Sequence, residues 1–199
     1  MEARTRRTQE ERSTAMRERL LDATVACLVD YGYSGTTVTR IAERAGVTRG
    51  AQVHHFRTKE DLVVAAIRHL AEQLAAQVIV EAPRLARSAD PVDATLDMLW
   101  KLHRGPIFVA TVELWVAART DPELANQVRE VEPIVLRGLG QLEGTGLERY
   151  VADGDAVNAV FTAMDTIRGL LISTWHLSPR QVEARWRRAK EQLRRIYAG

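Results

Sequence analysis

The 199-residue sequence predicts an all-helical protein. Apolar residues recur at intervals of three and four along most of the chain, and no segment shows the alternation of a half-buried strand. Two later segments begin with an Asp-Pro or a Ser-Pro pair, in which a capping residue precedes a proline at the first helical position. Hydrophobic residues make up 46% of the chain and charged residues 27%, as in globular proteins with a sizeable core.

The first helix is predicted over residues 8–31. Thr8 and Glu11 have the spacing of a capping box, in which each side chain pairs with a backbone N–H group of the other residue. The inner side of this helix carries Met16, Leu20, Cys27, Leu28 and Tyr31. Cys27 is the single cysteine of the sequence, which excludes an intrachain disulfide and metal sites built on several thiolates.

Two short helices joined by a tight turn are predicted over residues 37–56, TVTRIAERAGVTRGAQVHHF. Thr37 and Thr48 can cap them, because a threonine oxygen accepts a hydrogen bond from a backbone N–H group of the first turn. Gly46 ends the first of the two helices, where a positive φ is wanted. Gly46 and Ala42 are small enough for a close crossing, which predicts a helix-turn-helix whose second helix enters a DNA major groove. An ordinary αα-hairpin in a helical bundle fits the same pattern.

A long fourth helix is predicted over residues 59–81. A second capping box at Thr58 and Asp61 begins it, and Pro83 stops it. The short polar segment 83–91 is the predicted boundary between the functional halves. Further helices are predicted over residues 92–103, 106–119, 122–143, 155–176 and 179–197, with a bend at Pro133.

The stretch 32–62, GYSGTTVTRIAERAGVTRGAQVHHFRTKEDL, resembles the DNA-binding domain of the TetR family of bacterial transcriptional regulators. The resemblance extends over residues 8–68. Family members usually carry a leucine and a tyrosine where this chain has Gln52 and Val53. That tyrosine commonly contacts a DNA phosphate, so this contact is not carried over to Val53. The matching residues are Gly32, Thr36, Thr37, Val38, Ile41, Ala42, Ala45, Gly46, Val47, Gly50, His55, Phe56, Lys59 and Leu62.

The resemblance implies an all-α protein with an N-terminal three-helix DNA-binding domain, residues 1–58. A helical effector-binding and dimerisation domain, residues 59–199, would follow, with residues 59–82 as the connecting helix. It implies a homodimer that binds double-stranded DNA at a palindromic operator. It further implies a repressor, released by a small apolar or aromatic effector whose identity the sequence does not give. The alternatives are a helical regulator that answers to a protein partner, and a helical ligand-binding protein with a weakened DNA reader.

The candidates for DNA contacts come from the helix-turn-helix and its flanks. Arg49, Gln52 and His54 are candidates for base edges, because arginine can form two hydrogen bonds with guanine and glutamine two with adenine. In the register of the family, position 52 faces inward, where the amide of Gln52 needs a buried partner. Residues 1–60 hold eleven basic and eight acidic side chains, a modest positive bias that suits a polyanion. The candidates for phosphate contacts are Thr37, Thr48, His55 and Lys59.

The last two predicted helices are candidates for a dimer interface. An apolar seam recurs along residues 179–197, and the helix at 155–176 has one bulky face and one face of smaller residues. The resemblance implies that two such helices from each subunit form a four-helix interface. The alternative is that both faces of the 155–176 helix are buried within one subunit. The candidate interface residues are Ala159, Ala163, Thr166, Leu170, Ser173, Val182, Trp186, Ala189 and Leu193.

Residues 84–177 contain enough aromatic and methionine side chains to line an apolar cavity. A few polar residues in these otherwise apolar helices are candidates for orienting a ligand. The alternative is a filled core in which Asp165 and Arg168 form an ion pair three residues apart. The candidate ligand-binding residues are Trp100, His103, Phe108, Thr111, Trp115, Met164, Asp165, Arg168 and Trp175.

Common enzyme motifs are missing from the sequence, including a glycine-rich phosphate loop, HExxH and GxSxG. His54 and His55 are adjacent, so on a helix they point about 100° apart, unlike metal ligands one turn apart. We therefore expect no catalytic site, no metal site and no cofactor. No run of about 20 apolar residues suits a membrane span, and no apolar run follows the N-terminal arginines. We expect a cytoplasmic protein.

Overall fold

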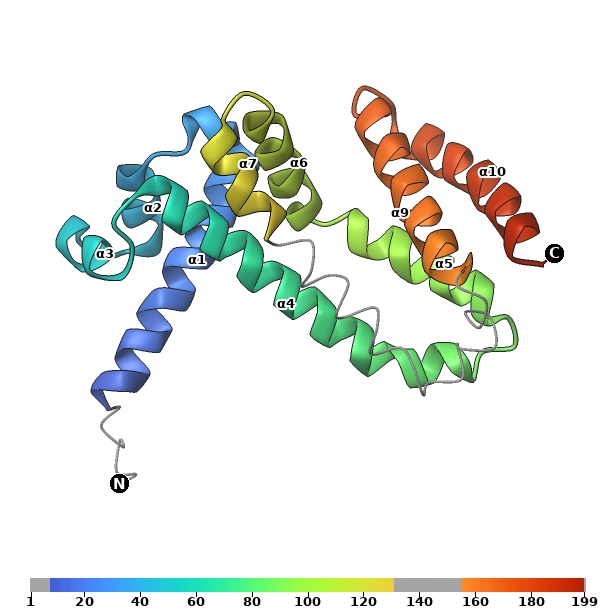
Figure 1. Cartoon of the computed structure of the whole chain (residues 1–199), viewed down its shortest axis with the longest axis horizontal. Helices are drawn as coiled ribbons and strands as arrows, with labels where there is room; N and C mark the ends of the chain where they lie inside the picture. The colour runs from blue at the N-terminus through green and yellow to red at the C-terminus, as the bar shows by residue number, and fades with distance from the viewer. Residues whose placement is uncertain (1–7, 131–154, 199) are drawn as a thin grey trace. The chain divides into compact units, whose positions relative to one another are not determined.

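The computed structural model describes residues 8–130 and 155–198, and the regular elements within them are α-helices (Figure 1). The predicted all-helical class is confirmed. The rest of the helix predicted at 122–143, with its bend at Pro133, lies outside the described residues. The helices are α1 (Gln9–Gly35), α2 (Val38–Ala45), α3 (Arg49–His55), α4 (Lys59–Ala86), α5 (Pro91–His103), α6 (Pro106–Ala118), α7 (Pro122–Arg129), α9 (Asp155–Ser173) and α10 (Pro179–Ala198).

Capping side chains begin several of these helices, as the sequence predicts. At α1, Oγ1 of Thr8 accepts from the N–H of Glu11 at 3.2 Å, and Oε2 of Glu11 accepts from the N–H of Thr8 at 2.8 Å. At α7, Oδ1 of Asp121 accepts from the N–H of Leu124 at 3.0 Å. Each bond pairs a backbone donor that the first helical turn leaves without a partner. These helix starts are therefore local properties of the sequence.

Helix α4 is longer than predicted. It continues through Pro83 to Ala86, so the prediction that Pro83 stops it is wrong. A proline removes one backbone donor and crowds the preceding turn, but only about one further turn follows. Leu85 in that turn is 7% exposed, and its burial offsets part of the cost of the proline.

From Lys59 to Leu85, α4 is also long and apolar enough to cross a membrane, by length and composition alone. The expectation that no segment reaches this length is therefore wrong. Core helices of globular proteins meet the same criterion, and Leu62, Val63 and Ala66 of α4 are fully buried. Burial against protein accounts for part of its apolar composition.

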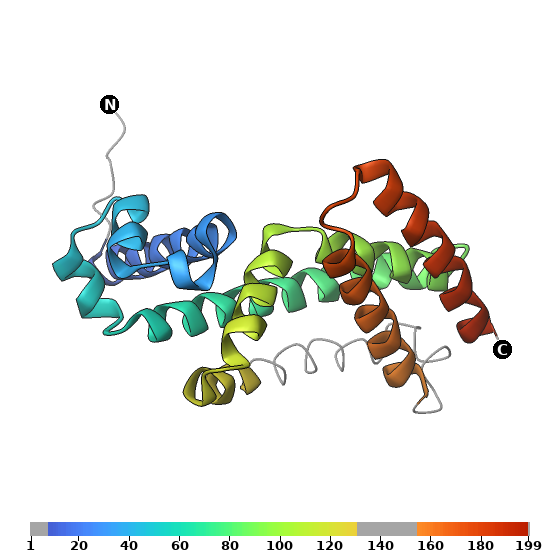
Figure 2. The ribbon, with the colours of Figure 1, turned by 90° about the horizontal axis from the view of Figure 1, so that it is seen from above.

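The chain divides into two compact units. Unit 1 comprises Met1–Ala71 and Val109–Ile134, and unit 2 comprises Glu72–Phe108 and Val135–Gly199, so α4 and α6 contribute residues to both. In unit 1, α2 packs on α1 and α3 packs on α2 (Figure 2). The domain boundary proposed after residue 58 stays a prediction. Fully buried residues of this part include Leu20, Leu21, Leu28, Ile41 and Leu62.

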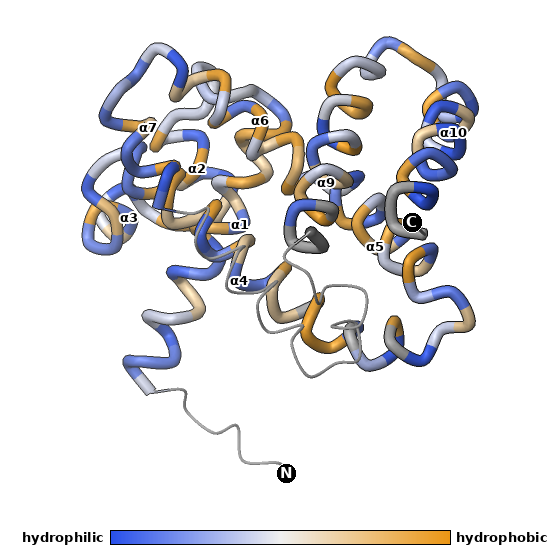
Figure 3. Tube along the Cα trace, turned by 45° about the vertical axis from the view of Figure 1, so that its right-hand side comes forward, coloured by the Kyte–Doolittle hydropathy of each residue, from blue (hydrophilic) through white to orange (hydrophobic). Residues whose placement is uncertain are grey.

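In unit 2, α5, α9 and α10 pack against one another (Figures 1 and 2). The rings of Trp100 on α5 and Trp186 on α10 are stacked, with centroids 4.6 Å apart and planes 6° apart. Helix α10 is mainly hydrophilic and carries apolar residues only at intervals (Figure 3). Trp186 and Leu193 belong to its buried side. The stacked tryptophans therefore add a large buried aromatic contact to the aliphatic core of this bundle.

Candidate DNA interface

The connection between α1 and α2 depends on a left-handed glycine. Gly32, near the end of α1, has a φ of 66°, a conformation that any side chain disfavours. The carbonyl oxygen of Gly32 accepts from Oγ1 of Thr36 at 2.7 Å and from the N–H of Thr36 at 3.1 Å. Local hydrogen bonds therefore set the direction in which the chain leaves α1.

Two charged side chains hold Tyr33, the residue after this glycine. Oε2 of Glu113 on α6 accepts from the N–H of Tyr33 at 3.1 Å, and a β-carbon at Gly32 would lie 2.7 Å from the same oxygen. Nζ of Lys59, at the start of α4, donates to the carbonyl oxygen of Tyr33 at 2.7 Å and lies 3.7 Å from the centre of its ring. Burial lowers the pKa of Lys59. Burial is also the largest cause that raises the pKa of Tyr33 to about 12, and the negative charge of Glu60 raises it further. Glu113 is 80 positions from Tyr33, so no local pattern could relate the two.

Helix α2 and the turn after it agree with the prediction. Oγ1 of Thr37 accepts from the N–H of Arg40 at 3.3 Å, which confirms the cap. Gly46 has a φ of 64° and a ψ of 39°, and the N–H of Val47 donates to the carbonyl oxygen of Ala42 at 3.0 Å. A β-carbon built on Gly46 meets no atom within 4 Å. Conformational freedom, and not space, is therefore the reason for a glycine here.

Helix α3 has one buried side and one exposed side. It begins at Arg49 after Thr48, whose Oγ1 accepts from the N–H of Ala51 at 3.3 Å. Gln52 on its inner side is fully buried, and Phe56, directly after the helix, is 7% exposed. The exposed residues of α3 are Arg49, Gly50, Val53 and His54.

The prediction that Gln52 contacts a base edge is wrong. Its side chain is fully buried, and Nε2 donates to the carbonyl oxygen of Phe56 at 2.6 Å. Among the residues that the structure describes, Oε1 of Gln52 has no hydrogen-bond partner. Burying an amide with one end unpaired is costly. The side chain closes the last turn of α3 and is not available to DNA in this arrangement.

Four other candidates for DNA contacts lie on the surface of unit 1. Arg49 and His54 belong to the exposed side of α3. Thr37 and Thr48 are exposed at the starts of α2 and α3. Their oxygens accept the capping bonds, which leaves each hydroxyl hydrogen available to donate to a phosphate. Contacts of these side chains with DNA stay predictions.

The side chains of the two remaining candidates, His55 and Lys59, already make contacts within the protein. His55 is half-buried, and its ring meets that of His54 edge-on, with centroids 5.6 Å apart. Lys59 donates to Tyr33, although an ammonium group has two further donors. Their phosphate contacts also stay predictions, and packing within unit 1 accounts for part of the role of each.

The helix-turn-helix region matches a known family. Residues 20–66 match the family model described as bacterial regulatory proteins, tetR family. Over 196 residues the chain is 30% identical to the HTH-type transcriptional regulator CymR of Pseudomonas putida, a match that covers 96% of this chain and 90% of CymR. The chain belongs to the TetR family. It is a helix-turn-helix transcriptional regulator that binds DNA.

Two further comparisons agree with this assignment to the TetR family. The HTH-type transcriptional repressor AcnR of Corynebacterium diphtheriae is 30% identical over 161 residues, which cover 79% of each chain. The crystal structure of the multidrug binding protein EbrR complexed with proflavin is similar with a TM-score of 0.58 at 25% identity, covering 89% of this chain and 99% of EbrR. TetR-family proteins are transcriptional regulators, which are not enzymes.

Within residues 8–130 and 155–198, no group of three or more His, Cys, Asp or Glu side chains could hold a metal ion.

Part of the predicted ligand site of this TetR-family protein lies in the interior of unit 2. Trp100, Phe108 and Met164 are between 5% and 6% exposed. Nδ1 of His103 lies 2.8 Å from a backbone carbonyl oxygen one turn earlier, and its ring meets Phe108 edge-on at 5.7 Å. Burial lowers the pKa of His103, and the nearby positive charge of Arg168 lowers it further, against the opposing effect of that backbone hydrogen bond. Its surroundings therefore favour the neutral imidazole.

Other predicted ligand residues lie elsewhere. Trp175 is 57% exposed, and the carboxylate of Asp165 is exposed and pairs with Arg168 at 3.3 Å. Neither side chain is part of a buried site in this subunit, which corrects the prediction for both. The ion pair of Asp165 with Arg168, weighed as the alternative, is present. Thr111 and Trp115 fall in unit 1, and their role in ligand binding stays a prediction.

Several predicted dimer contacts are buried within unit 2. Ala163, Trp186 and Leu193 are 0%, 2% and 3% exposed. The prediction that these side chains meet a partner subunit is therefore wrong, because the apolar seam of α10 packs within its own subunit. The side chain of Ala159 lies outside what the structure describes. Of the other candidates, Ser173 is exposed, and those that are half-buried are Thr166, Leu170, Val182 and Ala189.

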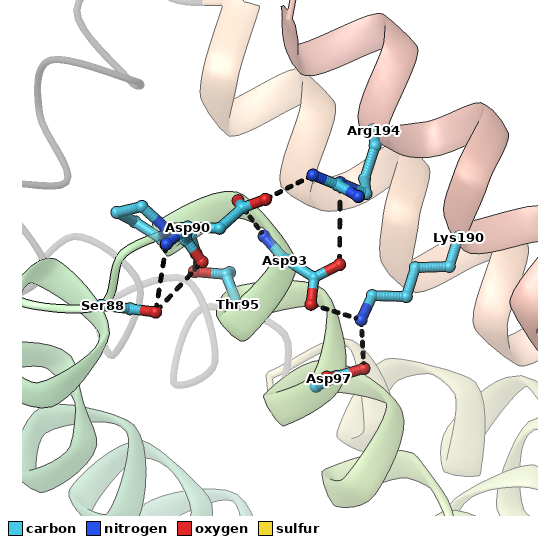
Figure 4. A network of polar contacts seen from close by, with 8 residues as sticks. Ser88, Asp90, Asp93, Thr95, Asp97, Lys190 and Arg194 are labelled. Atoms are coloured by element: carbon cyan, nitrogen blue, oxygen red, sulfur yellow. Dashed lines mark hydrogen bonds and ion pairs between the residues drawn. The ribbon is translucent and has the colours of Figure 1, made fainter.

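An ion-pair network holds α10 on the start of α5 (Figure 4). Nζ of Lys190 lies 2.8 Å from Oδ2 of Asp93 and 2.6 Å from Oδ1 of Asp97. Arg194 pairs with Asp90, and its Nε lies 3.6 Å from Oδ1 of Asp93. Burial opposes the charge of Lys190, but its hydrogen bonds with the two aspartates outweigh burial and raise the pKa of Lys190. The network therefore adds charged contacts to the buried packing of α10 on α5.

Proposed function

We propose that this TetR-family protein is a homodimeric repressor of a palindromic operator and is released from DNA by a small-molecule effector. The observation that carries the proposal is the outward face of α3, where Arg49 and His54 are exposed beside the Gly46 turn. Two copies of α3 enter successive major grooves about 34 Å apart, because a two-fold symmetric dimer reads two equivalent half-sites. The similarity to the repressor AcnR supports repression. The protein acts in the cytoplasm, where bacterial DNA lies.

The outward face of α9 is the proposed dimer surface. Thr162, Asp165, Gly169 and Ile172 are exposed, and their spacing of three, four and three places them on one side of the helix. Gly169 leaves room for a second helix, and Ile172 is 42% exposed, an apolar exposure that a partner subunit would remove.

Replacing Ile172 with Arg tests this surface. The variant should be monomeric when its mass is measured by light scattering after size-exclusion chromatography. Val80→Arg, at a valine of α4 that is 72% exposed, is the matched control and should remain dimeric. A dimeric Ile172→Arg protein would remove this face of α9 from the proposal.

The proposed effector is a small apolar or aromatic molecule bound in unit 2. Trp100, Phe108 and Met164 are apolar side chains in the interior of this unit, and Nε1 of Trp100 has no hydrogen-bond partner among the described residues. A buried donor without a partner costs about 1–3 kcal/mol, and an acceptor atom on the effector would remove this cost. The structure of EbrR complexed with proflavin supports this class of molecule.

Release from DNA is proposed to be a population shift. An effector that binds more tightly to a state in which the two α3 helices do not fit successive grooves lowers the population that binds DNA. Helix α4 is the proposed route, because Lys59–Ala86 contributes residues to both units. Helix α6 is a second route, because Glu113 accepts from the N–H of Tyr33.

Selection of bound sequences from random duplex DNA, at a stated salt concentration, tests the proposed function. A palindromic motif would support a dimeric, sequence-specific regulator. The absence of any enriched motif, or binding that disappears uniformly at physiological salt, would contradict it. That outcome would favour the second candidate, a helical ligand-binding protein with a weakened DNA reader, which the buried amide of Gln52 makes the relevant alternative.

A further inference from the structure

Val53 is the exposed apolar side chain of α3. It is 47% exposed and follows Arg49 by one helical turn, so the two side chains are neighbours on the outward face. Gly50 lies on the same exposed face and adds no side chain that could cover the isopropyl group. Val53 therefore lies beside the candidate base-reading arginine, on the surface proposed to enter the major groove.

The chemistry of valine limits what Val53 can contact in DNA. Its side chain neither donates nor accepts a hydrogen bond, which excludes a polar contact with a phosphate or with the polar atoms of a base edge. The apolar group that base pairs display in the major groove is the C5-methyl group of thymine. Contact between this methyl group and an isopropyl group removes apolar surface of both from water.

The geometry of the valine side chain favours such a contact. A β-branched residue in a helix is restricted largely to one χ1 rotamer. Val53 therefore loses little side-chain entropy when it is covered, in contrast to a long flexible side chain. Its position is set by α3, whose start is capped by Thr48 and whose inner side is buried at Gln52.

We propose that Val53 is a specificity-determining residue that reads the methyl group of a thymine next to the base pair read by Arg49, once in each half-site. The inference rests on the proposed function, because it requires α3 to enter the major groove. The operator then carries, in each half-site, a thymine whose methyl group contributes to affinity independently of its base pairing.

Replacing thymine with uracil in the selected operator tests this role, because uracil lacks the methyl group and keeps the same base pairing. Wild-type protein should bind about fourfold more weakly for each half-site in which the relevant thymine is replaced, the effect of burying roughly one methyl group. Val53→Ala should bind the thymine operator more weakly than wild type and should show no uracil effect. Fluorescence anisotropy titrations at one salt concentration measure all four combinations.

A matched variant separates this contact from a general loss of apolar surface. Val116→Ala removes the same atoms from a valine of α6 that is 60% exposed, and it should keep the uracil effect of the wild type. Circular dichroism and thermal melting verify that the variants share one fold. Equal uracil effects in wild type and Val53→Ala, or no uracil effect at any thymine in wild type, would overturn the assignment of Val53. Failure of the selection to yield any motif would instead contradict the proposed function, and the inference with it.

Discussion

The helix-turn-helix of unit 1 and the α5–α9–α10 bundle of unit 2 are both helical, but different interactions hold them in shape. In the helix-turn-helix, side chains pair with backbone groups a few positions away, as Thr48 does at α3, and Gly46 supplies the left-handed turn. In the bundle, contacts join residues far apart in the chain, as in the stacking of Trp100 on Trp186.

This difference suits DNA reading by unit 1 and the effector binding that we propose for unit 2. Reading DNA requires side chains to be placed within about 0.5 Å of a productive geometry, which rigid local hydrogen bonding provides. A bundle that holds an effector depends instead on buried area, which is large at each aromatic side chain and is shared among several helices. Changes on the exposed face of α3 should therefore alter recognition at small cost in stability, and changes at buried side chains of unit 2 should cost stability.

The largest expected effect is in unit 2. Trp186→Ala should lower the free energy of unfolding by about 3–5 kcal/mol, because a buried aromatic side chain and its stacking on Trp100 are lost. Chemical denaturation followed by circular dichroism measures this loss. Trp175→Ala, at a tryptophan that is 57% exposed, should change it by no more than about 0.5 kcal/mol. Similar losses of unfolding free energy in the two variants would show that burial does not distinguish the contributions of the two tryptophans.

The next effect concerns DNA affinity. Arg49→Ala should weaken binding to the selected operator by about 1–3 kcal/mol, because two hydrogen bonds to a base edge are lost. Its melting temperature should not change, since Arg49 is exposed. Arg188→Ala, which removes the same charge from an exposed position of α10, is the control. Unchanged operator affinity would remove Arg49 from the base-reading set.

A pair of glycines tests the local geometry of the reader. Gly46→Ala should destabilise the protein by about 1–2 kcal/mol, because a side chain disfavours its φ of 64°. Gly50→Ala should stabilise it by up to about 1 kcal/mol, because Gly50 lies within α3 with open space around it. Denaturation curves of both variants check the two signs. If both substitutions change stability in the same direction, backbone conformation is not what distinguishes the two sites.

The smallest expected effect is a pH dependence in unit 2. Burial lowers the pKa of His103 below 6.5, so the unfolded chain takes up a proton at a higher pH than the folded protein does. The stabilisation from a neutral His103 is fully present above the unfolded pKa and is lost as the pH falls from there through the folded pKa. Melting temperatures between about pH 7.5 and pH 5.5 should therefore fall more in wild type than in His103→Gln. Equal falls would show that other groups account for the dependence.

The caps of unit 1 and its turn glycine Gly46 could be predicted because their interactions close within a few residues. Thr8, Thr37 and Thr48 each accept from a backbone N–H three residues later, as the sequence patterns indicate. The same reasoning failed at Gln52, because residue type suggested a base contact while helix position placed the amide inside. It also failed at Pro83, through which α4 continues to Ala86.

The assignment of helix faces in unit 2 could not be predicted with the same success. The α10 seam that contains Trp186 and Leu193 has a spacing equally suited to a partner subunit and to the interior of its own subunit. The choice between them depends on α5, whose aspartates and Trp100 meet α10 from almost a hundred positions earlier in the chain. A periodic pattern shows that a face is apolar, but it carries no information about which surface covers it.

The sequence by itself determined that this chain is helical, where most of its helices begin, and that it carries a TetR-family helix-turn-helix. Periodicity, caps and turn glycines act over three or four residues, so they can be read without a structure. The tertiary structure alone decided that Trp186 packs on Trp100, that Glu113 holds the N–H of Tyr33, and that Val53 remains exposed on α3. A helix buries the face that its neighbouring helices cover, because this packing removes apolar surface from water. Those neighbours are distant in the chain, so a local pattern cannot identify them.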